Sequence, residues 1–172
     1  MTSPPAIPSL ESRIAEARAF AILAHGDQLY GKKPYVVHLD LVLDLAIAYG
    51  LSETACVAAP LHDTLEDTST VQADLEARFG QEAADQVDSV SGEGATRREQ
   101  RASIVAKLTA RPDHAPLKLV DRLANVLLSI EDGRQDLLDM YRKEMPDYAP
   151  VFANAHPVAY QRLCSLLNWH PA

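Results

Sequence analysis

The chain has 172 residues, of which 47% are hydrophobic, 6% aromatic and 23% charged, and its formal net charge at pH 7 is −8. This length and a composition rich in Leu, Ala and Val predict one self-folding domain over residues 1–172 with an all-α fold, a compact multi-helix bundle. The negative charge disfavours nucleic acid as a partner, the lack of a hydrophobic run of about 18 residues disfavours a membrane span, and the isolated Cys56 and Cys164 indicate a reducing, cytoplasmic location.

The N-terminal part of the sequence predicts two helices joined by a loop that contains Gly, Lys and Pro. We expect residues 1–8 to be disordered and the first helix to run from Ser9 or Ser12 to the region of Gly26. A second helix should span residues 35–49 and end before a glycine. The buried side of this second helix is predicted to consist of Val37, Leu41, Leu45 and Ala48.

A strongly hydrophobic helix is predicted next, and it leads into the most polar segment of the chain. Ser52 begins this helix, and its Ala, Cys and Val residues predict a central position in the fold. Pro60 removes one helical hydrogen bond and should kink the chain just before the polar segment. Ser69, with Gln72 three residues later, has the pattern of a capping box for a helix that ends near Gly80.

The second half of the chain predicts further helices separated by Gly and Pro residues. A short helix should span residues 81–90, and a small-residue loop, 91–95, should precede a basic helix. Pro116 suits the first turn of a long helix that reaches Ile130, and the hydrophobic residues of a C-terminal helical segment, 147–172, suit packing on the core or on a second copy in a homodimer. The residues expected to divide the remainder into two or three shorter helices are Gly133, Pro146, Pro150 and Pro157.

The densest polar segment, His-Asp-Thr-Leu-Glu-Asp-Thr, directly follows the hydrophobic helix. In a helix, a spacing of four brings His62 near Glu66 and Asp63 near Asp67. Carboxylates so close together beside a hydrophobic segment are costly unless a cation neutralises them. The segment therefore predicts one side of a metal site.

Two further residues are candidates to complete such a site. His38 and Asp121 are polar residues that stand among core-forming neighbours on two other predicted helices. A mixture of imidazole and carboxylate ligands suits manganese, iron or zinc better than calcium or magnesium. A single histidine or aspartate of this kind is nevertheless more often a structural or solvated residue than a ligand.

Four separated motifs carry a family resemblance. They are Tyr35-x-x-His38, Leu61-His62-Asp63-Thr64-Leu65-Glu66-Asp67-Thr68, Arg78-Phe79-Gly80 and Lys118-Leu119-Val120-Asp121-Arg122-Leu123-Ala124-Asn125. In this order they resemble the hydrolase domain of RelA/SpoT-type proteins and the stand-alone small alarmone hydrolases, over about residues 15–145. Four ordered motifs are much more specific than a single His-Asp pair.

The resemblance implies an all-α HD-domain fold with one manganese ion per chain and removal of the 3′-pyrophosphate from guanosine tetra- and pentaphosphate alarmones. Glu66 and Asp67 would position and deprotonate the attacking water. A metal ion with open positions would lower the pKa of that water and offset charge on the phosphoryl group. The implied metal ligands are His38, His62, Asp63 and Asp121.

Substrate contacts follow from the same resemblance. Asn125 and Tyr141 match family positions near the nucleotide, and Lys32 and Lys33 are the preferred source of positive charge for a polyphosphate. Tyr30 replaces a family arginine that packs against guanine, and a tyrosine stacks on a purine without the charge and donors of a guanidinium, so discrimination between guanine and adenine should be relaxed. Further basic candidates are Arg97, Arg98, Arg101 and Arg122.

Three functions remain open at this point. The first is an alarmone pyrophosphohydrolase, and the second is an HD phosphohydrolase of other nucleotides, such as adenine-based alarmones or nucleoside monophosphates. The third is a regulatory domain that senses a nucleotide without turnover, which the presence of Glu66 and Asp67 disfavours. The expected partner is a small nucleotide in each case, and no second block of sequence is available for a nucleotide-making domain.

Overall fold

The computed structural model describes residues 8–171, so the predicted disorder of residues 1–8 falls outside the described residues apart from Pro8. The elements are α1 (Leu10–His25), β1 (Leu29–Tyr30), β2 (Lys33–Pro34), α2 (Val36–Ala48), α3 (Glu53–Ala58), the 3-10 turn η1 (Ala59–Leu61), α4 (Thr64–Asp67), α5 (Gln72–Phe79), α6 (Gln81–Val90), α7 (Arg97–Ala110), the 3-10 turn η2 (Pro112–His114), α8 (Ala115–Glu131), α9 (Gln135–Phe152) and α10 (Pro157–Leu167). The two short strands pair antiparallel, and every other regular element within residues 8–171 is helical, which confirms the all-α class.

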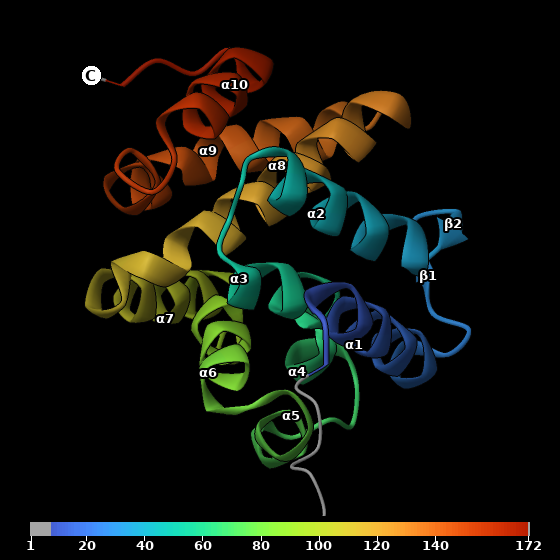
Figure 1. Cartoon of the computed structure of the whole chain (residues 1–172). Helices are drawn as coiled ribbons and strands as arrows, with labels where there is room; N and C mark the ends of the chain where they lie inside the picture. Colours follow the sequence, from blue (N-terminus) through green and yellow to red (C-terminus); the bar gives the residue numbers. More distant parts are fainter. Residues whose placement is uncertain (1–7, 172) are drawn as a thin grey trace, which may run out of the picture.

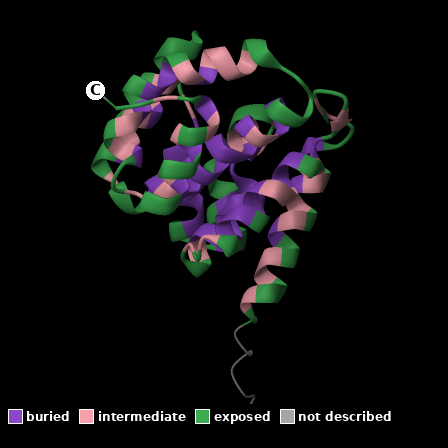
Figure 2. Cartoon of the chain, turned by 90° about the horizontal axis from the view of Figure 1, so that it is seen from above, coloured by how far each residue is buried: buried purple, intermediate pink, exposed green. Residues whose placement is uncertain are grey.

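Helix α8 crosses the middle of the molecule and packs against α2, α6, α9 and α10, while α1 lies against α3, α4 and η1 (Figure 1). Buried residues gather where these helices meet (Figure 2). The turn η1 is wholly buried and packs against α1, α2 and α3. The core therefore brings α2, η1 and α8 together, although they are far apart in the sequence.

Local backbone chemistry sets the ends of the first two helices. The Ser9 hydroxyl accepts a hydrogen bond from the Ser12 N–H (3.2 Å), which caps the start of α1. Helix α1 ends before Gly26 and α2 ends shortly before Gly50, and these glycines have φ angles of 55° and 66°. Because glycine adopts positive φ without the steric cost of a side chain, both predicted ends are confirmed.

The buried side of α2 differs from the predicted one. Val37 is 36% exposed and Ala48 is also exposed, whereas Val42 and Ala46 are fully buried. His38 is 1% exposed and lies on the same side as Val42. Residues four apart share one face of a helix, so turning His38 inward also turns Val42 and Ala46 inward. The prediction was therefore wrong for Val37 and Ala48, whereas Leu45 is buried as predicted.

Pro60 interrupts the hydrophobic helix as predicted. Helix α3 stops at Ala58, and Pro60 lies in η1, which leads directly into His62 and Asp63. The Thr64 hydroxyl then donates a hydrogen bond to the carbonyl of the last residue of η1 (2.7 Å). This change of direction places the side chains of His62 and Asp63 next to His38 of α2, and that of His62 also next to Asp121 of α8.

Helix α5 starts differently from the prediction. The Asp74 carboxylate accepts a hydrogen bond from the Val71 N–H (3.2 Å), and the helix begins at Gln72. The Thr68 hydroxyl organises the preceding turn by accepting a backbone N–H two residues later (3.1 Å). The capping pattern assigned to Ser69 and Gln72 was therefore wrong, whereas the predicted end of this helix and the short helix after it are confirmed.

A reciprocal capping box begins α7. The Thr96 hydroxyl accepts a hydrogen bond from the Glu99 N–H (3.2 Å), and the Glu99 carboxylate accepts hydrogen bonds from the N–H groups of Thr96 (3.0 Å) and Ala95 (2.9 Å). These contacts satisfy donors that the first turn of a helix leaves free. They order the start of the helix that carries Arg97 and Arg101.

We expect Thr96→Ala to lower the free energy of unfolding by about 1 kcal/mol, because the Glu99 N–H loses its acceptor. Urea denaturation followed by circular dichroism measures this loss. Thr109→Ala removes an exposed hydroxyl that bonds only within the same helix, and this control should cost less than about 0.5 kcal/mol. Equal losses for the two variants would contradict the capping role.

Pro146 and Pro150 lie inside α9 and do not divide it, so the prediction of separate shorter helices there was wrong. Met145, Tyr148 and Phe152 are at most 2% exposed and pack α9 against its neighbours α7, α8 and α10. This burial outweighs the hydrogen bonds that the two prolines cannot donate. Helix α10 packs on α8 and α9, which is one of the two arrangements expected for the C-terminal segment.

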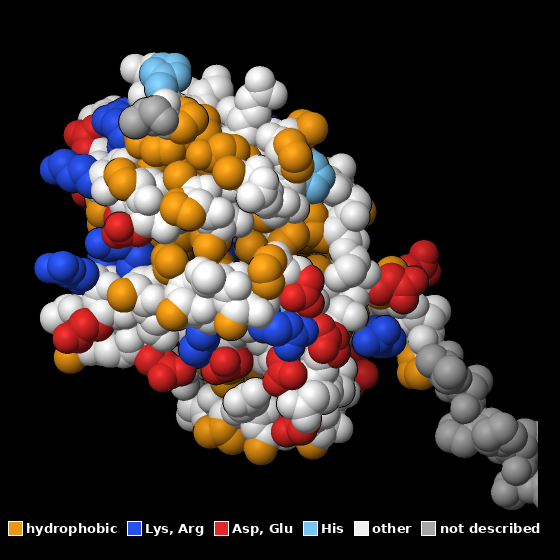
Figure 3. Space-filling model, turned by 90° about the vertical axis from the view of Figure 1, so that its left-hand side faces the viewer, with side chains coloured by type: hydrophobic (Ala, Val, Ile, Leu, Met, Phe, Trp, Pro, Cys, Tyr) orange, Lys and Arg blue, Asp and Glu red, His pale blue; other side chains and the backbone are white. Residues whose placement is uncertain are grey.

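The surface is mixed in character. On the face shown in Figure 3, hydrophobic side chains gather in the upper half, and acidic and basic side chains lie close together below them. Among the residues that the structure describes, no helix has the length and hydrophobicity that a membrane span requires. The most exposed large hydrophobic residues are Leu23, Val158, Leu29, Val71 and Ile47.

Candidate metal centre and active site

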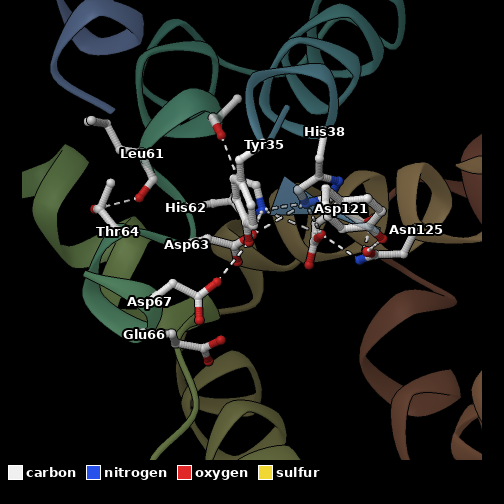
Figure 4. Close-up of polar contacts among 12 residues, drawn as sticks. Tyr35, His38, Leu61, His62, Asp63, Thr64, Glu66, Asp67, Asp121 and Asn125 are labelled. Carbon is white, nitrogen blue, oxygen red and sulfur yellow. Dashed lines mark hydrogen bonds and ion pairs between the residues drawn. The ribbon is translucent and has the colours of Figure 1, made fainter. Parts of the chain in front are cut away.

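Two histidines and two aspartates bring four potential ligand atoms together where α2, η1 and α8 meet (Figure 4). The Nε2 atoms of His38 and His62 lie 3.0 Å apart. Asp63 Oδ2 is 2.9 Å from His62 Nε2 and 3.3 Å from His38 Nε2. Asp121 Oδ1 is 3.4 Å from the His38 nitrogen and 3.5 Å from the His62 nitrogen. Both histidines and Asp121 are at most 3% exposed.

These distances fit a divalent metal ion. Bonds of about 2.1 Å to a single ion place neighbouring ligand atoms roughly 3.0–3.4 Å apart in octahedral or tetrahedral geometry. His62 Nδ1 lies 2.7 Å from the Ala59 carbonyl oxygen, so Nδ1–H donates and Nε2 keeps its lone pair for a metal. His38, His62 and Asp121 form a group whose ligand atoms all lie within 4.8 Å of one another. The donor set therefore suits a borderline divalent ion.

The buried groups of the cluster hold one another in their charged forms. Burial opposes the charge on Asp63, yet His62 and His38 keep the pKa of this aspartate well below its usual value. Burial likewise opposes the charge on Asp121, whose pKa is kept well below its usual value by Lys118 and His62. The two carboxylates raise the pKa of His62 well above its usual value despite burial. The two carboxylates thus favour a proton on the imidazole, and a divalent ion would bind by taking the place of that proton at Nε2.

Tyr35 connects the cluster to the neighbouring carboxylate. Its hydroxyl oxygen lies 2.7 Å from Asp63 Oδ2 and 2.8 Å from Asp67 Oδ2, so the single hydroxyl proton serves both acceptors. The Tyr35 ring stacks on His25, with ring centroids 4.2 Å apart. Sequence reasoning assigned no role to Tyr35, although its spacing of three from His38 places both on one side of the chain.

The Glu66 carboxylate lies beside the cluster, next to Asp67 in Figure 4. Its Oε1 accepts a hydrogen bond from the backbone N–H of Gly92, in the loop after α6. A side chain at Gly92 would come within 2.7 Å of the Gln100 side chain, so glycine at this position allows the loop to pass close to α7. Glu66 is an exposed residue, but partial desolvation of its carboxylate raises its pKa, although Lys118 and the Gly92 hydrogen bond oppose the rise. A raised pKa makes the carboxylate a better proton acceptor.

Lys118 places a buried ammonium group next to Asp121 and within electrostatic reach of Asp63 and Glu66. Its Nζ lies 3.0 Å from Asp121 Oδ2, and the residue is 7% exposed. Burial would lower the pKa of Lys118, but Asp121 and the other acidic groups raise it, so the ammonium stays charged. No role was predicted for Lys118, and the available signal was a lysine three residues before a proposed ligand on an otherwise hydrophobic helix face.

A cavity of about 240 Å³ opens beside these groups. Its acidic lining residues are Asp63, Glu66, Asp67, Asp121 and Glu144. Its basic lining residues are Arg97, Arg101, Lys118 and Arg122. Its aromatic lining residues are Tyr30, Tyr35, Tyr141 and Tyr148. The cavity thus joins the candidate metal centre to a cluster of positive charge.

The sequence pattern of the HD domain family matches residues 17–158, which is more than half of the chain. The chain belongs to the HD domain family. The match includes all four residues of the candidate metal centre, and it agrees with the helical bundle that surrounds them.

Two relatives of this HD domain carry the name guanosine-3′,5′-bis(diphosphate) 3′-pyrophosphohydrolase. The protein from Aquifex aeolicus is 33% identical over 151 residues, covering 84% of this chain and 22% of its own length. The protein from Xenopus tropicalis, named MESH1, is 32% identical over 126 residues, covering 66% of this chain and 67% of its own length. The chain thus spans about a fifth of the Aquifex relative and two thirds of the Xenopus relative.

Two solved structures resemble the HD domain in fold. One, described as a metazoan ortholog of SpoT that hydrolyses ppGpp, superposes with a TM-score of 0.78 at 21% identity, covering 95% of this chain and 97% of that chain. The other, a protein from Listeria monocytogenes EGD-e, has a TM-score of 0.64 at 25% identity, covering 83% of this chain and 98% of that chain. The predicted HD-domain fold is confirmed.

The structure brings some of the predicted substrate-binding residues to the metal centre of the HD domain. The Tyr30 ring stacks on His38, with ring centroids 4.6 Å apart, and the Tyr30 hydroxyl donates a hydrogen bond to Asn125 Oδ1. Asn125 Nδ2 donates to Asp121 Oδ1 (2.7 Å). Burial raises the pKa of Tyr30, so it remains a neutral phenol. Tyr141 lines the same cavity.

The two predicted lysines lie elsewhere in the HD domain. Lys33 Nζ forms ion pairs with Glu131 (2.9 Å) and Asp132 (3.1 Å) at the end of α8. Lys32 is exposed in the turn between the two short strands, and neither lysine is among the residues that line the cavity within residues 8–171. The positive charge in the cavity comes instead from α7 and α8.

Proposed function

We propose that this HD domain is a metal-dependent pyrophosphohydrolase that removes the 3′-pyrophosphate from guanosine tetra- and pentaphosphate, giving GDP or GTP and pyrophosphate. The observation that carries the proposal is the shared cavity, which Asp63 and Asp121 of the metal centre line together with Glu66 and Asp67. The names of the two relatives support the same chemistry and substrate class.

We propose manganese as the metal, held by His38, His62, Asp63 and Asp121. Two imidazole nitrogens and two carboxylate oxygens form a donor set that manganese, iron and zinc all accept. The bound ion would supply Lewis acidity toward a phosphate oxygen and lower the pKa of a coordinated water.

In the proposed reaction, the residues around the metal centre activate and orient the attacking water. Water attacks the phosphorus atom bonded to the ribose 3′-oxygen, and a new P–O bond forms. The bond from phosphorus to that oxygen breaks, its electron pair stays on the oxygen, which takes up a proton, and pyrophosphate departs. Glu66 accepts the proton that the water loses, because it lines the same cavity as the metal centre and its raised pKa makes the carboxylate more basic. Asp67, hydrogen-bonded by Tyr35, orients the water.

Pyrophosphate release from guanosine tetraphosphate and from its adenosine counterpart, with and without manganese, tests the proposed function. We expect manganese-dependent release from the guanosine compound. Because Tyr30 stacks on His38 and its hydroxyl binds Asn125, no guanidinium is available at this position to select guanine, and the adenosine compound should also be cleaved. Release from neither compound by protein that contains metal would refute the proposal and favour a sensing role.

Glu66→Gln is expected to lower kcat at least about a hundredfold while the metal stays bound, because the amide cannot accept the proton of the attacking water. The measurement combines initial rates of pyrophosphate release with metal content by elemental analysis. Glu76→Gln, at an exposed glutamate on α5, is the matched control and should keep the parent rate. A Glu66→Gln variant with the parent rate would exclude Glu66 as the general base.

The homodimer and the cytoplasmic location stay predictions. Size-exclusion chromatography with light scattering at several protein concentrations tests the first of them.

A further inference from the structure

Three arginines that line the cavity share one buried glutamate. Arg97 binds both Glu144 oxygens (2.6 and 3.1 Å), Arg101 Nη1 lies 3.2 Å from Glu144 Oε1, and Arg122 Nη1 lies 2.7 Å from Glu144 Oε2. Arg101 also binds Asp147 through Nε (2.6 Å). Three guanidinium groups therefore face two carboxylates, and the cluster retains net positive charge.

The arginines of the cluster are held by ion pairs and keep unused donors. The Arg122 guanidinium lies over the rings of Tyr141 and Tyr148, 4.6 and 4.8 Å from their centroids, and Arg122 is 5% exposed. Within residues 8–171, Arg97 Nη1 and Arg101 Nη2 donate no hydrogen bond to the protein. Both arginines line the cavity. Fixed guanidinium donors that line a cavity are suited to the oxygens of a phosphate group.

A second cavity of about 270 Å³ adjoins the first and has a different character. The two cavities share Tyr30, Asn125 and Tyr141, and Tyr30 and Asn125 contact His38 and Asp121 of the metal centre. Leu128 and Leu137 line the second cavity and not the first, and none of the three clustered arginines lines it. The charged first cavity and the more hydrophobic second cavity therefore adjoin at Asn125, which binds Asp121.

We propose, on the basis of the proposed function, that Arg97 and Arg101 bind the outer phosphate of the substrate's 3′-pyrophosphate, and that Glu144 positions them for it. The inner phosphate, which is attacked, belongs at the metal centre on the border of the charged cavity. The outer phosphate then reaches the arginines, and the nucleoside with its 5′-phosphates points toward the second cavity. The arginines hold the pyrophosphate that departs and do not hold the 5′-diphosphate.

Equilibrium binding to manganese-loaded Glu66→Gln protein shows which of the substrate's two diphosphate groups the arginines contact. The ligands are guanosine tetraphosphate, which carries both groups, and GDP, which carries only the 5′-diphosphate. In this background, Arg101→Gln should weaken tetraphosphate binding roughly tenfold, the loss of one charge-assisted contact, and leave GDP binding within about twofold. Isothermal titration calorimetry measures both dissociation constants.

Arg98→Gln is the matched control, because Arg98 is exposed one residue from Arg97, does not line the cavity, and its loss changes net charge equally. It should leave both dissociation constants unchanged, and unchanged GDP binding by Arg101→Gln shows that the site is still folded. Arg101→Lys, which keeps the charge, should recover part of the tetraphosphate affinity.

Two results would overturn the assignment. Equal weakening of both ligands by Arg101→Gln would place the 5′-diphosphate at the arginines, and no weakening of either would leave them a purely structural role. Failure of the manganese-loaded Glu66→Gln protein itself to bind tetraphosphate would refute the proposed function, and the assignment of the arginines with it.

Discussion

Asp63→Ala is expected to remove metal binding and hydrolysis together, with a loss of about 10⁴-fold in kcat/KM. The Asp63 carboxylate is the oxygen closest to both histidine nitrogens, at 2.9 and 3.3 Å. Without it, His38 and His62 face each other with a single carboxylate, that of Asp121, nearby. A metal ion commonly supplies several kcal/mol of transition-state stabilisation, and about 5.5 kcal/mol corresponds to the expected factor.

Metal content and rate are measured on the same preparation, since the two must fall together. Asp44→Ala is the matched control, because Asp44 is exposed on α2, the helix that carries His38. This control should keep both the metal and the parent activity. An Asp63→Ala protein that retained its metal and lost only activity would show that the centre binds the ion without this carboxylate.

Glu144→Gln is expected to lower the free energy of unfolding at pH 7 by about 3–5 kcal/mol, the largest stability effect we predict. The side chains of Arg122 and Glu144 are each 6% exposed, and this contact is the ion pair that holds the Arg122 guanidinium between two tyrosine rings. Removing one partner of a buried pair leaves the other charge without water and without a counter-ion. Urea denaturation at constant protein concentration measures the loss.

The effect of Glu144→Gln should depend on pH in a defined direction. Burial opposes ionisation of Glu144, but Arg97 and Arg122 hold its pKa below the usual value in the folded state. A depressed pKa stabilises the fold above the ordinary glutamate pKa of about 4.3, and this contribution is lost as the pH falls through the lower folded-state value. The difference between parent and variant should therefore shrink below about pH 4. A difference that stayed constant from pH 7 to pH 3 would contradict this origin.

Much of the fold follows from short-range signals in the sequence. The ends of α1 and α2 depend on glycines that tolerate positive φ, and the interruption at Pro60 depends on a missing donor. The ordered motifs around His38, His62 and Asp121 likewise identified the residues that the structure brings together. The glycine and proline effects depend on neighbours within a few residues, whereas the separated motifs were connected by their resemblance to a known family.

Two of the wrong predictions, the buried side of α2 and the division of α9, share one cause, which is packing between distant segments. The buried side of α2 is set by its packing against α8 and η1. Helix α9 continues through its two prolines because Met145, Tyr148 and Phe152 are buried against other helices. Propensity is a weak influence wherever such burial competes with it.

By itself, the sequence determined the class of fold and the ends of most helices, because backbone conformation depends on near neighbours, and its resemblance to a known family indicated the four residues of the candidate metal centre. Only the tertiary structure decided that positive charge reaches the cavity from Arg97, Arg101 and Lys118 while Lys33 pairs with Glu131 and Asp132. The partner of a charged side chain depends on which groups the fold brings within a few ångströms, and the partners of Arg97, Arg101 and Lys33 lie roughly 40 to 100 positions away in the sequence.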